Sequence, residues 1–125
     1  MVSVTENRSV ALQDNEALFV SVIVGNGQLG GTYIEVSRGP DKIVVAKAAD
    51  ITNLFVGTGK TLRGFALLVR TAVVDVNPHT DWTIITHRIK RGNAAETNES
   101  FTKEADTQKP GSDGIVLYTI TYTFN

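Results

Sequence analysis

The chain contains no cysteine, and this absence removes several kinds of chemistry at once. Disulfides, thiolate metal ligands and a cysteine nucleophile are all excluded. The fold must therefore be held by the packing of apolar side chains. The hydrophobic content of 42% is enough for a chain of 125 residues to bury one core. We expect a single domain over residues 1–125.

Charge of one sign and long apolar runs are also missing. Lys and Arg number 12 and Asp and Glu number 13, so no overall field draws the chain to nucleic acid or to anionic lipid. No run approaches the ~18 apolar residues of a membrane span, and residues 1–10 lack the apolar stretch of a signal peptide. We expect a soluble chain, cytoplasmic by default, with export by a route without a visible signal left open. We expect no nucleic-acid, membrane or nucleotide partner.

Short runs of β-branched and aromatic residues, separated by turn residues, dominate what is present. This pattern predicts an all-β fold, an antiparallel β-sandwich of about seven or eight strands. Residues 51–56 fit a strand or a helical turn equally well. The strands that we expect are residues 9–12, 18–24, 32–37, 42–48, 82–90 and 115–124.

Three of these strands carry more detail. Residues 18–24 are apolar on both faces, which predicts a central strand. Residues 32–37 and 42–48 flank a turn that contains Gly39 and Pro40, and they form the clearest hairpin. Residues 115–124 alternate apolar side chains with threonines, so we expect one face in the core and one in solvent.

Two segments are harder to interpret. Residues 61–76 fit one bent strand, two strands or a helix. The β-branched residues favour strand, with a bulge or break near Gly64 or Arg70. Residues 91–113 are polar and predict a long loop before the last strand, which is a candidate contact surface.

Two glycine runs resemble nucleotide-binding motifs. Residues 25–30 read G-x-G-x-x-G, but a strand pattern follows where a dinucleotide site needs a helix. Gly59, Lys60 and Thr61 match the end of a phosphate loop, but Leu54 occupies the position of its first glycine. We interpret both runs as turns between strands.

The candidate ligand residues lie around the next turn. Asp75, Asn77, His79 and Asp81 alternate there and could hold a cation such as calcium, although the same residue types build turns that cap themselves. Trp82 and Tyr33 are candidate platforms for a carbohydrate, although a single tryptophan usually lies in the core. We expect no other cofactor.

A basic cluster follows on residues 87–91. Arg88, Lys90 and Arg91, together with Phe101, are candidate contacts to a protein partner. Alternation along a strand should point successive members of the cluster to opposite faces.

Catalytic motifs are weak throughout the chain. No serine lies in a nucleophile elbow, and His79 and His87 are the only side chains that would act as bases near neutral pH. The leading hypothesis is a non-enzymatic protein-interaction or structural assembly module. The alternative is a module that binds a small ligand, carbohydrate or calcium-assisted, and a small enzyme of unknown type is third.

Overall fold

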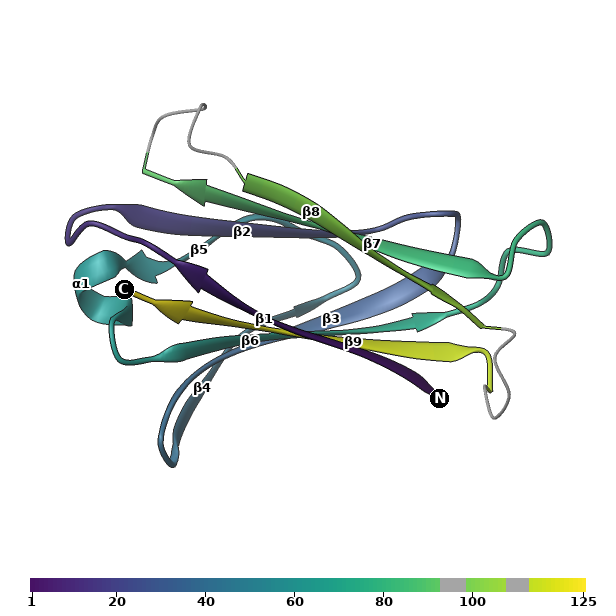
Figure 1. Cartoon of the computed structure of the whole chain (residues 1–125), viewed down its shortest axis with the longest axis horizontal. Helices are drawn as coiled ribbons and strands as arrows, with labels where there is room; N and C mark the ends of the chain where they lie inside the picture. The colour runs from purple at the N-terminus through teal and green to yellow at the C-terminus, as the bar shows by residue number, and fades with distance from the viewer. Residues whose placement is uncertain (93–98, 108–112) are drawn as a thin grey trace.

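Two β-sheets make up most of the computed structural model, which describes residues 1–92, 99–107 and 113–125 (Figure 1). These residues form nine strands and one short helix, α1 (Gly59–Leu62). The strands are β1 (Val2–Val10), β2 (Ala17–Val24), β3 (Leu29–Arg38), β4 (Asp41–Ala48), β5 (Ile51–Thr58), β6 (Ala66–Val74), β7 (Trp82–Arg91), β8 (Glu99–Asp106) and β9 (Ile115–Phe124).

The two sheets pack face to face as a sandwich. The order is β1-β9-β6-β3-β4 in the five-stranded sheet and β5-β2-β7-β8 in the four-stranded sheet. The all-β sandwich that the sequence predicts is therefore confirmed. One side of the sandwich is bounded by β1 and β8, and the other side is bounded by β4 and β5.

Alternating side chains from both sheets fill the core. In β2, Leu18, Val20 and Val22 are fully buried, and the strand lies between β5 and β7 as its two apolar faces predict. In β9, Tyr118 and Ile120 are fully buried while the threonines face away from the core. The hairpin of β3 and β4 also forms as expected, with Gly39 in the turn at φ 58°.

The first strand differs from its prediction. We expected residues 9–12, but β1 covers Val2–Val10 and pairs with β9 in parallel, the exception in an otherwise antiparallel fold. Glu6 and Arg8 occupy inward positions of this strand and hide its alternation. They are accommodated because they pair with each other at the rim of the core, Arg8 Nε lying 2.6 Å from Glu6 Oε2.

The predicted long loop over residues 91–113 is also wrong. β8 lies within it and pairs with β7 from Trp82↔Asp106 to Ile89↔Glu99. Its polar composition misled the prediction because β8 is an edge strand, whose outward side chains meet solvent. Phe101 and Ala105 are the apolar residues of its inner face, and Lys103 lies between them.

The ambiguous segments resolve into several elements. Residues 51–56 belong to strand β5, and residues 61–76 contain the end of α1, a break and then β6. The break falls at Gly64, as expected, where φ is 87°. Among the described residues, no helix has the length and hydrophobicity to cross a membrane.

Candidate functional site

The first glycine run is a turn between β2 and β3. Asn26 and Gly27 both have positive φ, 57° and 66°, which is the conformation of a tight hairpin turn. The amide of Gly25 donates to the Ile84 carbonyl, and Gly30 lies so close to Val24 that a side chain there would collide with it. The glycines therefore serve the backbone path.

The second glycine run packs against the loop between β1 and β2. The amides of Gly59 and Lys60 donate to the carbonyls of Glu16 and Asp14, at 3.0 and 3.1 Å. These are the donors that a phosphate loop would turn toward its ligand. They are used here to fasten one loop to another.

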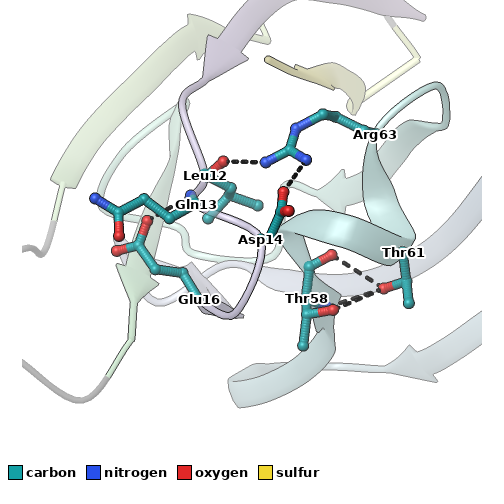
Figure 2. A network of polar contacts seen from close by, with 7 residues as sticks. All are labelled: Leu12, Gln13, Asp14, Glu16, Thr58, Thr61 and Arg63. Carbon is teal, nitrogen blue, oxygen red and sulfur yellow. Dashed lines mark hydrogen bonds and ion pairs between the residues drawn. The ribbon is translucent and has the colours of Figure 1, made fainter.

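Arg63 completes this loop-to-loop network (Figure 2). Its guanidinium donates to the Leu12 carbonyl at 2.6 Å and forms an ion pair with Asp14. Gln13 N donates to Glu16 Oε1, which holds the loop in a turn. The network fixes the end of the sandwich that carries α1.

The turn with the four candidate metal ligands is tied by its own hydrogen bonds. Asn77 Oδ1 accepts from the His79 amide, and Asp75 Oδ2 accepts from the Thr107 hydroxyl. Gln28 also holds the turn in place. Its side chain accepts hydrogen bonds from the amides of residues 76 and 77 and donates to the carbonyls of residues 80 and 82. Within the described ranges, no group of three or more His, Cys, Asp or Glu side chains is placed to hold a metal. A cation at Asp75, Asn77, His79 and Asp81 stays a prediction.

The two candidate platforms lie on opposite outer faces of the sandwich. Trp82 begins β7 in the four-stranded sheet and is 48% exposed, so the expectation of a core tryptophan is not met. Tyr33 lies in β3 of the other sheet, where its hydroxyl donates to Glu35 Oε2 at 2.6 Å. This hydrogen bond raises the pKa of the Tyr33 hydroxyl. The rings of Trp82 and Tyr33 therefore cannot contact the same small ligand.

The basic cluster divides between faces, as its strand position predicts. Arg88 is exposed, and the Lys90 ammonium lies 6.0 Å from the ring centre of Phe19 on the same outer face. Arg91 turns to the end of the sandwich, where it donates to the Ala11 carbonyl and pairs with Glu99. Phe101 points inward and lies against His87.

A polar and aromatic cluster closes the side formed by β1 and β8. The Arg8 guanidinium lies 3.5 Å above the Phe101 ring, and Lys103 reaches Glu6 at 2.5 Å. These ionic and cation-π contacts connect β1, the edge strand of one sheet, to β8, the edge strand of the other. Lys103, with help from Arg8, lowers the pKa of Glu6 against the opposing effect of burial.

His87 lies beneath this cluster and is fully buried. Its Nδ1 is 2.7 Å from the Tyr122 hydroxyl, and its Nε2 has no hydrogen-bond partner among the described residues. Burial lowers its pKa to about 4, so the ring is neutral at pH 7. With no exposed surface, His87 cannot reach a substrate in this conformation.

The opposite side, formed by β4 and β5, is open and apolar. Ile43 is 63% exposed on this side. Val44 and Phe55, 50% and 54% exposed, lie on the outer faces of the two sheets, where the Phe55 ring is 5.7 Å from that of Phe19. Between the two edges lies a hollow of about 210 Å³, which we call the apolar groove. Its lining includes Val36, Val45, Val56, Leu62 and Phe65 beside Ile43.

The apolar groove was not predicted from the sequence. The run Ile43, Val44 and Val45 is apolar on both faces of its strand, which is the pattern of a central strand. The structure places it at an edge instead. That mismatch between composition and position is the signal that identifies the site.

Comparison of the chain with family models, with curated proteins and with solved structures found no match.

Proposed function

We propose that this chain is a non-enzymatic protein-interaction or assembly module, and that the open side between β4 and β5 is its contact surface. One observation carries the proposal: Ile43 is 63% exposed and lines the apolar groove, between β4 and β5, which are edge strands of the two sheets among the described residues. Exposed apolar residues that gather around a hollow are typical of protein-protein contacts.

The contrast between the two sides supports this proposal. The side formed by β1 and β8 is covered by an ion-pair and cation-π cluster, while the other side presents aliphatic and aromatic side chains. Both sides end in edge strands, so sheet geometry alone does not account for the difference. A partner that covers the open side would account for it.

Irregular edges indicate how a partner would dock. β4 has a register shift opposite Ile34 and Glu35, and β5 has two register shifts against β2. Bulged edges resist the regular addition of another strand. A partner would therefore be recognised mainly by its side chains inserted into the groove. Hydrogen bonds between its main chain and the edge strands would contribute less.

The energies involved are appropriate for an anchor. Fully burying an Ile side chain contributes roughly 1.5–3 kcal/mol, so covering Ile43, which is 63% exposed, would contribute about 1–1.5 kcal/mol. A stable interface of about 800 Å² per partner needs further contacts around this centre.

The test is complex formation in the cells that produce the chain. Tagged wild-type chain is compared with Ile43→Ser, and Leu29→Ser is the control because Leu29 is 61% exposed at the far end of the same sandwich. We expect a complex by light scattering after size exclusion, lost in Ile43→Ser and kept in the control. A wild-type chain that stays monomeric and captures no protein would contradict the proposal.

One observation favours the small-ligand alternative. Trp82 presents 48% of its surface to solvent, next to the turn that carries Asp75 and Asp81. A carbohydrate or calcium ion at about 100 times its dissociation constant would stabilise the fold by about 2.7 kcal/mol. Thermal melts with a glycan and metal panel, repeated with Trp82→Ala, would show a shift that the variant loses. Unchanged melts across the panel would remove this alternative.

A further inference from the structure

We propose that the outer face of the four-stranded sheet is a second contact surface, and that its partner is another copy of this chain, related by a two-fold axis that crosses the strands. This face is separate from the apolar groove, so the inference goes beyond the proposed function and does not depend on it. Two observations carry it: the face bears exposed apolar side chains, and its positive and negative charges lie at opposite ends.

Apolar side chains occupy much of this outer face. Side chains alternate between the two faces of a strand, so the residues between the buried positions of β2 and β7 point outward. Residues directly opposite each other on paired strands share a face, which adds Phe55 through its pairing with Phe19. Phe55 is 54% exposed and Trp82 is 48% exposed, so solvent reaches the apolar side chains at both ends of the face. The apolar residues of the face are Phe19, Ile23, Phe55, Trp82 and Ile84.

The charged side chains of the face are divided between its two ends. Arg88 and Lys90 are outward residues near the end of β7. Glu104 lies directly opposite Ile84, and Asp106 lies opposite the first residue of β7, so both carboxylates share the outer face at the start of that strand. Arg88 and Ile84 are four residues apart, which separates the Arg88 guanidinium from the Glu104 row by about 13 Å. Arg88, Lys90 and Glu104 take part in none of the ion pairs among the described residues.

A two-fold axis can bring the opposite charges of two copies together. The axis lies in the contact plane and crosses the strands at the row where Thr86 pairs with Thr102. Residue 88 and residue 84 lie two residues on either side of this row, so Arg88 of each copy comes over Ile84 of the other. Glu104 lies beside Ile84 on the same face, so it meets the Arg88 guanidinium of the second copy.

The same axis matches the ends of the face. Lys90 of each copy comes over Trp82 of the other copy, where the ring offers a cation-π contact and Asp106 lies on the adjacent strand. An axis that runs along the strands would instead bring Arg88 against Arg88 and Glu104 against Glu104. The separation of charge therefore selects the crossing axis, because complementary charges at an interface also exclude the wrong arrangement.

The size of the face is sufficient for a specific dimer. Its strands contain 8 to 10 residues. At about 3.3 Å per residue and about 4.8 Å between strands, four strands cover about 550 Å², or about 1,100 Å² for the two copies. Specific protein interfaces begin at about 1,000 Å² in total. We therefore expect a dimer at the weak end of specific association.

The first test exchanges the two charges. Sedimentation equilibrium of the purified intact chain should show a dimer, and Arg88→Glu or Glu104→Arg alone should raise its dissociation constant about tenfold. Arg88→Glu combined with Glu104→Arg restores an opposite pair across the contact, so its dissociation constant should return to within about threefold of the wild type. Leu29→Ser and Ile43→Ser change residues on other faces and should leave the dimer unchanged.

The second test determines the orientation of the two copies. The chain contains no cysteine, so Arg88→Cys combined with Glu104→Cys supplies the only two thiols. Within one chain these positions are too far apart for a disulfide, which needs Cα atoms less than about 7 Å apart. We expect oxidation to link two copies of this variant, and to link few copies of Arg88→Cys alone.

The outcomes separate this inference from the proposed function. A purified chain that stays monomeric at every concentration would overturn the dimer, while the groove would still be tested by the complex formed in cells. A dimer that Ile43→Ser dissociates would show that the groove is the surface of self-association, and the outer face would be wrong. Failure of the exchanged charges to restore the dimer, or efficient linking by Arg88→Cys alone, would also overturn the inference.

Discussion

At the scale of single residues, the fully buried His87 determines part of the response to acid. Burial lowers its pKa from 6.5 to about 4, and its Nε2 has no partner among the described residues. The unfolded chain takes up a proton near pH 6.5 that the folded chain excludes until about pH 4. The stability that comes from neutral His87 is therefore complete above pH 6.5 and is lost as the pH falls toward 4.

We expect the free energy of unfolding to fall by about 3 kcal/mol between pH 6.5 and pH 4 because of this group, measured by urea denaturation. The comparison protein combines His87→Phe with Tyr122→Phe, which removes both partners of the buried hydrogen bond. Carboxylates such as Glu6 titrate in both proteins and cancel in the difference. An identical pH profile in the two proteins would contradict the role of His87.

Gly59 is a second residue with a specific prediction. A side chain there would collide with the Gln13 carbonyl, so Gly59→Ala should destabilise the chain by about 2 kcal/mol or more. Gly31 in β3 has open space and an ordinary φ, so Gly31→Ala should be neutral or stabilise by about 0.5–1 kcal/mol. Thermal melts of the two variants test the pair. Equal melting temperatures would show that the loop around Gln13 can move to accommodate a side chain at residue 59, and would contradict the prediction.

Sequence reasoning at this scale succeeded where a residue's role is local. The turn roles of Gly27, Gly39 and Gly64 follow from backbone conformation, and the structure gives all three positive φ. It gives less where a residue's surroundings depend on a distant strand. A partner contact at Phe101 stays a prediction, and β7 and β9 bring His87 and Tyr122 beside its ring. Spacing along the chain does not encode that meeting.

At the scale of elements, β8 offers the sharpest test. As an edge strand with β7 as its neighbour, its alternate amides should be protected from hydrogen exchange and the amides between them should exchange quickly. Native-state exchange resolved by NMR measures this over residues 99–106. Uniformly fast exchange would contradict strand β8 and would support the loop that the sequence predicts for residues 91–113.

The strands that sequence reasoning found are those with an unbroken apolar pattern. β2 is apolar on both faces and β9 alternates cleanly, because each inner face must carry apolar side chains into the core. β1 and β8 were missed or shortened because edge strands carry charge, here Glu6 and Lys103, which the two strands satisfy through each other. This pairing of charges between β1 and β8 becomes visible only when the positions of both strands in the fold are known.

At the scale of the whole molecule, the sandwich has one closed side and one open side. On the open side, Ile43 contributes little to folding because it is 63% exposed, whereas Ile34, on the neighbouring strand, is fully buried. We expect Ile43→Ser to change the free energy of unfolding by less than about 0.5 kcal/mol and Ile34→Ala to cost about 2–5 kcal/mol. Chemical denaturation measures both. A large loss for Ile43→Ser would mean that the groove is structural.

The central claim is that the open side meets a protein partner, and site-specific photo-crosslinking tests it most directly. A benzophenone amino acid replaces Ile43 in one protein and Leu29 in another, two positions exposed to nearly the same extent, 63% and 61%. After irradiation in the cells that produce the chain, we predict a discrete crosslinked protein from position 43 and none from position 29. The same products from both positions, or none from position 43, would contradict the account.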